Sequence, residues 1–545
     1  MVPAQVTYRR KTYTVTTIGA ELFSGCKRLT SVVIPDTVTA IAYAAFYNCT
    51  GLTHIEIPDS VAYIGYCAFE GCKRLTSIRL PQGLTEIKGN AFSRCAALAA
   101  ITIPEYVEKI AVNTFRECDA LKEIAVDKRN RVYDSRDNCN AIIVTKTKTL
   151  YLGCSGSVIP QGVWVIGENA FGMCKAPTNI EIPDSVVRIK HGAFSWSENL
   201  TSVRLPKGLK YIEDNAFGMC EKLASVAFPE TLEIIGKYAF QDCSSITSVV
   251  IPRNVKRLHH TTFQGCSSVV KMQVETGNTR YDSRDGCNAI IESRTLTLVT
   301  GCKNSTIPAS VLHIGEGAFE TCKNMRAIKI PDSVTSIGNR AFACCVNLRS
   351  VHIPKSVEKI GKQAFQGCAR LLKIEVHKDN KVYDSRGNCN AIIHTRSKTL
   401  LRGSRKTIIP LDIVKIDEMA FDECCGLKSV VIPESVKIVG ACAFGNCPIE
   451  KVVFAEGLTR IELGAFFGCE KLTEIALPNK LKYIGEAAFA SCSRLRSVVI
   501  PKLVEEIGIA LFFDCNSLET VKIENENVII KDDAFDYHDK VIWVR

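Results

Sequence analysis

Residues 29–49 read LTSVVIPDTVTAIAYAAFYNC, and this stretch is one copy of a pattern that fills the chain. Within each block of copies the phenylalanine recurs every 23 residues, with one shorter step of 22 residues between Phe444 and Phe466. A repeat of roughly 20 to 50 residues predicts a solenoid, because one coil cannot bury its apolar face alone and must stack on its neighbours. The phased positions are Phe23, Phe46, Phe69, Phe92, Phe115, Phe171, Phe194, Phe217, Phe240, Phe263, Phe319, Phe342, Phe365, Phe421, Phe444, Phe466, Phe489, Phe512 and Phe535.

Each coil is predicted to hold two extended pieces and a turn. Residues 29–34 alternate between apolar and polar positions, which is typical of a short strand. Pro35 has no amide hydrogen to donate and suits the end of that strand. Val38 and Ile41 mark a second extended piece, and Ala45-Phe46 marks a short helical or tight turn. The sequence therefore predicts an α/β solenoid of 23-residue coils, rich in β-strand, that stack into a curved superhelix.

Three insertions interrupt the repeat. The phenylalanine step lengthens to 56 residues at each of them, which leaves 33 extra residues. The insertions resemble one another at 133–143, 281–291 and 383–393, and each continues into a polar turn and a second apolar strand, so we interpret them as β-hairpin units. Their Asp-rich stretch lacks the spacing of a calcium loop, and Gly387 stands where the other copies have Asp, which favours turn chemistry over a metal site.

We expect one continuous solenoid domain, because the repeat keeps its phase on both sides of each insertion. Val6-Thr7-Tyr8 and Thr12–Val15 flank a polar turn and predict an N-terminal hairpin, while Val541–Val544 predict a last strand; both are candidate caps. The predicted segments are the N-terminal hairpin cap and first coil (1–22), coil blocks at 23–126, 160–274, 308–376 and 410–545, the last ending in the C-terminal cap, and hairpin inserts at 127–159 (insert 1), 275–307 (insert 2) and 377–409 (insert 3).

The chain has 26 cysteines, and 17 of them follow a repeat phenylalanine by three residues. Ser197 and His538 are the exceptions at that place. A single cysteine per coil offers no tetrahedral metal cluster, and we interpret these thiols as small buried hydrophobic groups. Hairpin pairs Cys139 with Cys154 and Cys287 with Cys302 are the best disulfide candidates, although Ser404 stands in the third copy.

Composition and motifs argue against catalysis. The chain is 46% hydrophobic and 23% charged, which indicates a folded protein, and its net charge of +11 is spread along the sequence. No nucleophile, phosphate-loop or dinucleotide motif is found, so we expect no catalytic residue, metal or cofactor. No apolar run approaches the ~18 residues of a membrane span, and residues 1–6 do not resemble a signal peptide. A cytoplasmic protein, or one whose export signal has been removed, fits this start.

Residues 330–348 read IPDSVTSIGNRAFACCVNL, and this unit looks like the treponemal-type leucine-rich repeat of BspA-like surface proteins. The opening VTYRRKTYTVT at 6–16 and the three insertions resemble hairpins of such arrays. The resemblance implies a leucine-rich-repeat solenoid with no catalytic residues. It also implies a cell-surface or secreted protein of a host-associated microbe, with a role in adhesion, co-aggregation or host sensing.

The leading hypothesis is a protein-binding or adhesion scaffold that binds host matrix or bacterial surface proteins through its strands. One alternative is a structural spacer or assembly module that holds another component. The other is binding of a polyanion, a glycosaminoglycan or a nucleic acid, although the outward strand positions carry no aromatic residue on which bases could stack.

The candidate partner-binding residues form a basic cluster on three consecutive coils, which Glu375 partly offsets. An acidic protein or a glycan is the expected partner, because opposite charges attract across an interface. The predicted cluster is Arg326, Lys329, Arg349, His352 and Lys373.

Overall fold

A computed structural model describes residues 1–174, 178–531, 534 and 541–543. The chain divides into two compact units, and each is treated by itself below. The first unit comprises 1–269 and 275–279, and the second comprises 270–274 and 280–545. Phe535, His538 and Val544 lie outside the described residues.

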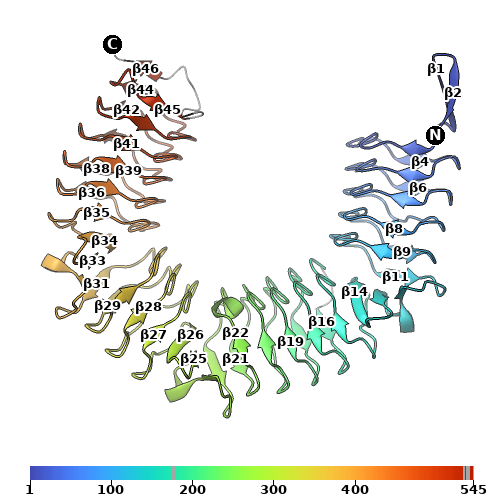
Figure 1. The fold of residues 1–545 in the computed structure, drawn as a ribbon, viewed down its shortest axis with the longest axis horizontal. Helices are drawn as coiled ribbons and strands as arrows, with labels where there is room; N and C mark the ends of the chain where they lie inside the picture. The colour runs from blue at the N-terminus through green and yellow to red at the C-terminus, as the bar shows by residue number, and fades with distance from the viewer. Residues whose placement is uncertain (175–177, 532–533, 535–540, 544–545) are drawn as a thin grey trace. The chain divides into compact units, whose positions relative to one another are not determined.

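Both units are stacks of short parallel strands, as Figure 1 shows within each. A coil places one strand at the position of Ser31–Val33 (the first-strand column) and a second at the position of Ala40–Ile41 (the second-strand column). The tight turn that contains the repeat phenylalanine follows. The helices of the described chain are 3-10 turns, so the Ala-Phe segments are turns and the fold is a β-solenoid.

The first unit contains these elements. Its first-strand column is β4 (Ser31–Val33), β6 (His54–Glu56), β9 (Ala100–Ile103), β11 (Glu123–Val126), β16 (Asn179–Glu181), β18 (Ser202–Arg204) and β21 (Ser248–Ile251). Its second-strand column is β3 (Thr17–Ile18), β5 (Ala40–Ile41), β7 (Tyr63–Ile64), β8 (Glu86–Ile87), β10 (Lys109–Ile110), β15 (Val165–Ile166), β17 (Arg188–Ile189), β19 (Tyr211–Ile212), β20 (Ile234–Ile235) and β22 (Arg257–Leu258). The others are β1 (Gln5–Tyr8), β2 (Lys11–Thr14), β12 (Tyr133–Asp134), η1 (Arg136–Asn138), β13 (Ala141–Val144), β14 (Thr149–Gly153) and η2 (His260–Phe263).

The second unit repeats this organisation. Its first-strand column is β23 (Lys271–Val274), β29 (Ser350–Ile353), β31 (Lys373–Val376), β36 (Ser429–Ile432), β38 (Lys451–Phe454), β40 (Glu474–Ala476), β42 (Ser497–Ile500), β44 (Thr520–Ile523) and β46 (Val541–Trp543). Its second-strand column is β27 (His313–Ile314), β28 (Ser336–Ile337), β30 (Lys359–Ile360), β35 (Lys415–Ile416), β37 (Ile438–Val439), β39 (Arg460–Ile461), β41 (Tyr483–Ile484), β43 (Glu506–Ile507) and β45 (Ile529–Ile530). Its inserts hold β24 (Tyr281–Asp282), η3 (Arg284–Gly286), β25 (Ala289–Glu292), β26 (Thr297–Gly301), β32 (Tyr383–Asp384), η4 (Arg386–Asn388), β33 (Ile392–His394) and β34 (Thr399–Arg402).

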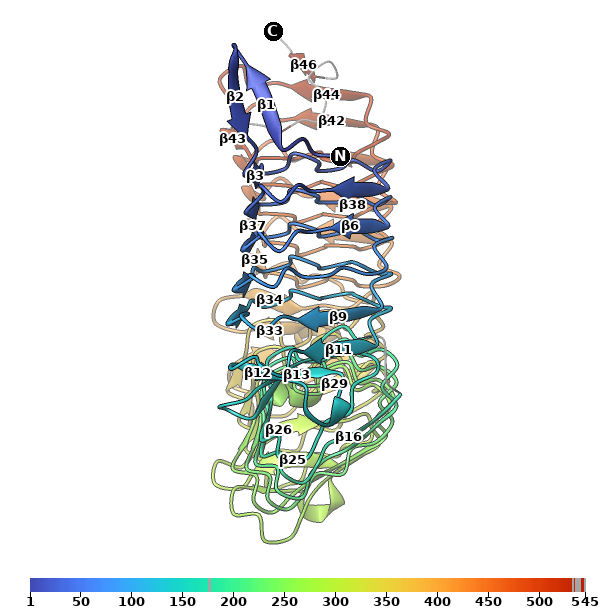
Figure 2. The same cartoon turned by 90° about the vertical axis from the view of Figure 1, so that its right-hand side faces the viewer.

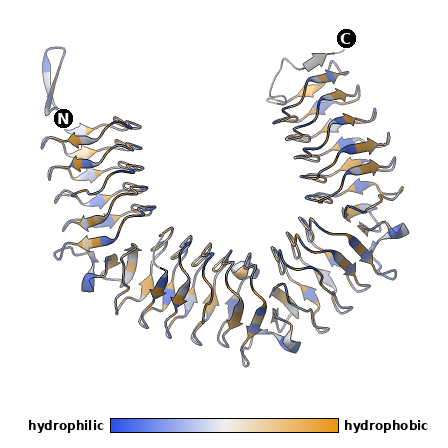
Figure 3. Ribbon diagram, turned by 180° about the vertical axis from the view of Figure 1, so that it is seen from behind, coloured by the Kyte–Doolittle hydropathy of each residue, from blue (hydrophilic) through white to orange (hydrophobic). Residues whose placement is uncertain are grey.

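The strands pair in register with the repeat. Ala40 pairs with Tyr63, its equivalent one coil later, and Ser31 pairs with His54 in the same way. Side chains alternate along each strand, so Val32 is buried while Ser31 and Val33 are exposed. Figure 3 shows apolar and polar residues next to one another along the strands. The exposed positions of paired first strands therefore lie side by side on one face of the stack.

The repeat phenylalanines stack face to face within each block. Phe69 and Phe92 have ring centroids 5.4 Å apart and planes 2° apart. The thiol three residues later donates to the previous coil, as when Cys72 Sγ lies 3.2 Å from the carbonyl oxygen of Phe46. Ser197 Oγ makes the same bond, 3.3 Å from the carbonyl of Phe171, which explains why serine is accepted there. All 26 cysteines are free thiols, so neither candidate hairpin disulfide is formed.

Each insert is an antiparallel hairpin built into the stack. In insert 1, β13 pairs with β14 antiparallel, and β14 then pairs parallel to β15 of the next coil. Asp137, Asp285 and Gly387 share a positive φ near 60°, a conformation that Gly and Asp tolerate, which confirms the turn interpretation. Burial opposes the charge of Asp134, but hydrogen bonds from Arg136 and Thr145 hold its pKa below the ordinary value.

The N-terminal hairpin forms as predicted but covers little of the core. Strands β1 and β2 pair antiparallel, and every residue in them is exposed. Figure 2 shows them extending away from β3. The predicted last strand is present as β46, which pairs with β44. Within the described residues no helix is long and apolar enough to cross a membrane.

Candidate partner-binding surfaces

The five residues of the predicted basic cluster all lie in the second unit. His352 and Lys373 stand on the neighbouring strands β29 and β31 and share the carboxylate of Glu375. Lys373 Nζ lies 2.7 Å from Glu375 Oε1, and His352 Nδ1 lies 3.9 Å from Oε2. Lys329 is exposed on the coil before them. Glu375 therefore offsets much of the positive charge that the sequence placed here.

Arg326 and Arg349 line a polar hollow of ≈ 600 Å³. Arg349 is bound through its backbone to the Arg326 carbonyl, 3.0 Å away, which fixes the two on adjacent coils. Arg370 Nη1 donates to Asn347 Oδ1 at 3.0 Å. No carboxylate is among the described residues that line this hollow, so its positive charge is not offset locally. Its lining, called here the basic hollow, is Lys303, Asn324, Arg326, Asn347, Arg349 and Arg370.

Sequence reasoning missed two cations of the basic hollow. Lys303 stands 23 residues before Arg326, but it belongs to insert 2, whose alignment with the coils is not evident from the phenylalanine series. Arg370 stands 23 residues after Asn347, in a column that was not among the strand positions considered. Extending the 23-residue period into the insert would have found Lys303.

A second hollow lies in the first unit, where insert 1 interrupts the turns between Phe115 and Phe171 (gap 1). In a regular coil the turn donates backbone N–H groups to the next turn, as Phe69 N does to Ala91 O at 2.8 Å. The insert coil continues this pattern with one bond, from Gly153 N to Ala170 O at 2.8 Å. The turn of the insert coil has no residues at the places where a regular turn would accept the other N–H groups. A cavity of ≈ 300 Å³ lies there.

Gly153 is required at this place. A Cβ there would lie 2.1 Å from a ring carbon of Phe171, closer than any side chain tolerates. The same close approach occurs between Gly301 and Phe319 and between Gly403 and Phe421. Each insert therefore packs a backbone, and not a phenylalanine, against the next ring.

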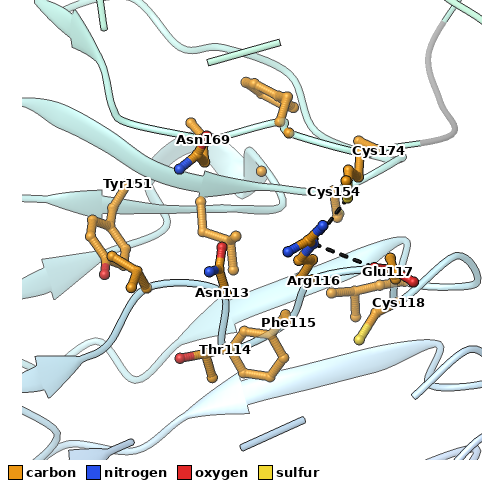
Figure 4. A pocket seen from close by; sticks show the side chains of 18 of the residues that line it. Asn113, Thr114, Phe115, Arg116, Glu117, Cys118, Tyr151, Cys154, Asn169 and Cys174 are labelled. Carbon is orange, nitrogen blue, oxygen red and sulfur yellow. Dashed lines mark hydrogen bonds and ion pairs between the residues drawn. The ribbon is translucent and has the colours of Figure 1, made fainter. Parts of the chain in front are cut away.

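Gap 1 has a mixed lining, part of which Figure 4 shows. Tyr151 and Leu152 lie at the insert side, and Tyr151 donates to the Ile110 carbonyl at 2.6 Å. Burial raises the pKa of Tyr151 to about 12, so the phenol remains a donor at neutral pH. Arg116 crosses from the Phe115 turn, with its Nε 2.9 Å from Met173 Sδ.

The carboxylates that line gap 1 outnumber its cations. Glu117, Asp119 and Glu168 line it together with Arg116, a net charge of −2 from three carboxylates and one guanidinium among the described lining residues. The Glu117 carboxylate lies 3.4 Å from Arg116 Nε. The gap thus has an apolar base, a partly neutralised arginine and an excess of negative charge.

Most of the chain matches one family model. Residues 14–139, 152–275, 290–391 and 414–542 match the family described as BspA type Leucine rich repeat region (6 copies). No curated protein matches the chain.

Several solved structures are similar to the chain. A leucine rich cell surface protein from Faecalibacterium prausnitzii is 22% identical, over 96% of this chain and 86% of that one, with a TM-score of 0.36. A leucine-rich repeat protein from Eubacterium ventriosum is 22% identical, over 68% of this chain and 83% of that one, with a TM-score of 0.44. The pneumococcal vaccine antigen PcpA is 18% identical, over 74% of this chain and 87% of that one, with a TM-score of 0.36.

Proposed function

Because the chain belongs to the BspA-type leucine-rich-repeat family, we propose that it is a non-catalytic protein-binding scaffold displayed on a bacterial cell surface. Solenoids of this family are generally non-catalytic and bind proteins. The partner we propose is an acidic host matrix or bacterial surface protein that docks on the second unit.

The basic hollow carries this proposal. Lys303, Arg326, Arg349 and Arg370 converge on one hollow, and no described carboxylate lines it. A rigid stack holds these cations at fixed spacing, which favours a partner with matching negative charge. Arginine also binds carboxylates with two parallel hydrogen bonds, which adds geometric specificity to the attraction.

The test replaces the four cations of the basic hollow by Gln. The purified array and the variant are each incubated with host matrix and bacterial surface extracts, and the Kd of a retained protein is measured by surface plasmon resonance. We expect the variant to bind at least about ten-fold more weakly, mainly through faster dissociation, with unchanged melting temperature. The matched control replaces Lys355, Lys359, Lys362 and Lys378, exposed lysines of the same unit, and keeps wild-type affinity. Equal affinity of the two variants would contradict the proposed surface.

A polyanion is the second candidate, because four cations without a carboxylate also suit sulfated or phosphorylated chains. The binding of heparin and the binding of the retained protein, each measured at about 0.05 M and about 0.5 M NaCl, separate the two cases. A protein partner retains measurable affinity at the higher salt, whereas a polyanion held only by charge dissociates.

A further inference from the structure

Insert 3 shows which group fills the place of gap 1 in the second unit. Arg402 ends β34, and its side chain is 3% exposed. Its Nη1 lies 3.1 Å from the carbonyl oxygen of Met419, and its guanidinium also faces the carbonyls of Asp422 and Cys368. The chain therefore buries a guanidinium against three backbone carbonyls between the Phe365 and Phe421 turns (gap 3).

Insert 1 has the same carbonyls without the arginine. The corresponding residues, 250 positions earlier, are Leu152, Asn169, Gly172 and Cys118, and all of them line gap 1. The Gly172 carbonyl accepts no hydrogen bond from the described residues, and the other two carbonyls each accept one backbone bond. Since a carbonyl oxygen can accept two bonds, three acceptors for a guanidinium remain.

The edges of gap 1 also expose backbone donors. In the regular turns, N–H groups at the positions of Asn113, Phe115 and Glu117 donate to the following turn, as Ala44, Phe46 and Asn48 do. Here the following turn is missing, and these three N–H groups have no acceptor among the described residues. A peptide that enters the gap can therefore receive hydrogen bonds on its own carbonyl groups.

We propose that gap 1 is a binding site for an arginine side chain of a protein partner. The guanidinium takes the place that Arg402 occupies in gap 3, bonds to the carbonyls of Gly172, Asn169 and Cys118, and is favoured by the net negative lining. Its methylene groups cover Leu152, and Arg116 moves aside because a thioether is a weak acceptor. This site rests on the proposed protein-binding function and adds a second contact, of opposite charge to the basic hollow.

The probe is the peptide acetyl-Gly-Arg-Gly-amide, titrated into the full chain carrying Trp164→Phe and Trp543→Phe, which leaves Trp196 as the one tryptophan. Trp196 lines gap 1 and is 44% exposed, so its fluorescence reports occupancy. We expect saturable binding with a Kd on the order of 1 mM for one buried side chain. The matched peptide with citrulline has nearly the same shape but no charge, and we expect it to bind at least about ten-fold more weakly. Equal affinity for the two peptides would overturn the proposal. This comparison changes the peptide and leaves the residues of gap 1 unaltered.

Two variants of Leu152 locate the binding. Leu152→Arg transplants the residue of insert 3 and should abolish peptide binding, while Leu152→Met keeps an apolar residue of similar volume and should retain it. Unchanged binding to a folded Leu152→Arg variant would also overturn the proposal. The failure of the scaffold function can be told apart from the failure of this site. A chain that binds the arginine peptide but retains no protein partner contradicts the scaffold function alone. A chain that retains a protein partner but does not bind the arginine peptide contradicts the site alone.

Discussion

Gap 1 and gap 3 are produced by the same hairpin inserted into the same stack, but they differ in what occupies them. In gap 3 Arg402 fills the interior, and Gln363 Nε2 bridges to Glu418 Oε1 at 2.9 Å across the outside. In gap 1 Leu152 stands in place of the arginine, and the described contact across the outside is the one from Arg116 to Met173. The residue at this position of the insert is therefore one clear difference between a gap that is filled and a gap that is open.

The largest expected effect concerns what the two gaps share, the thiol ladder at their edges. Burial raises the pKa of Cys118 at gap 1 to about 12, and burial, opposed by the charge of Arg402, raises that of Cys424 at gap 3 to about 11. Unfolded thiols ionise from pH 9.0, the ordinary value, so stability is complete below pH 9 and falls as the pH rises towards 11 or 12.

The loss is expected to reach about 1.4 kcal/mol per pH unit for each buried thiol, which over many thiols unfolds the protein. Thermal melts followed by circular dichroism between about pH 8 and about pH 11 measure this loss of stability. That range runs from below the ordinary thiol pKa to roughly the raised values. Constant stability over that range would show that the thiols are not buried as described.

Arg402→Leu is expected to have the next largest effect, because it removes the side chain that fills gap 3 and places there the residue that insert 1 has at Leu152. It removes the bonds to the Met419 and Asp422 carbonyls and leaves the buried Asp422 carboxyl, whose pKa burial already raises, without its neighbouring cation. We expect a loss of about 3 kcal/mol, measured by urea unfolding of the full chain. Leu152→Met in gap 1 is the control and should change stability by less than about 1.5 kcal/mol. A variant as stable as the wild type would mean that Arg402 is not a filling residue.

Gly153→Ala and Gly403→Ala test whether both inserts pack in the same way. The new Cβ meets the ring of Phe171 in one case and Phe421 in the other, at 2.1 Å in each. We expect both to destabilise the protein by about 2 kcal/mol, since the core must shift to admit the methyl group. Differential scanning calorimetry measures the melting temperature of each variant. A large decrease for one glycine variant and none for the other would show that the two inserts do not pack in the same way.

The smallest expected effect is a difference in thiol alkylation rate between the two gaps, which is measured on the wild-type protein without any substitution. Cys174 lines gap 1 and is partly exposed, whereas its equivalent Cys424 is 1% exposed beside Arg402. With iodoacetamide and peptide mapping by mass spectrometry, Cys174 should react faster than Cys424 in the native protein, while the exposed Cys26 and Cys425 serve as fast-reacting references. Equal rates would indicate that gap 1 is as closed as gap 3.

The solenoid was predictable because its cause is local and repeated. Phe46 and its equivalents occupy one core position per coil, and their fixed step implies the stacking that the structure shows. The inserts were identified as hairpins from their strand pattern, and the positive φ of Gly387 explains why glycine replaces Asp there. The gaps were not predicted, because they arise where the inserts lack residues that the turn of a regular coil has. The absence of those residues produces no recognisable motif in the sequence.

The basic surface was predicted only in part for a related reason. Arg326 and Arg349 were found from their place on successive coils, and the offset by Glu375 was expected, but the sequence does not give the 2.7 Å contact between Glu375 and Lys373. Lys303 lies 23 residues before Arg326, but the 23-residue period was not extended into insert 2, so this lysine was missed. Aligning the inserts with one another would have exposed Leu152 and Arg402 as equivalent residues with different chemistry.

The most direct test of this account is the number of arginine-peptide sites, counted as occupied gaps in crystals of each variant soaked with the peptide well above its expected Kd. Leu152→Arg should lower the stoichiometry by one site relative to the wild type. Arg402→Leu combined with Asp422→Gly reproduces Leu152 and Gly172 in gap 3 and should raise it by one. The chain with all three substitutions should return to the wild-type number. A stoichiometry that stays the same in every variant would contradict the claim that these positions determine which gap is filled and which is free to bind.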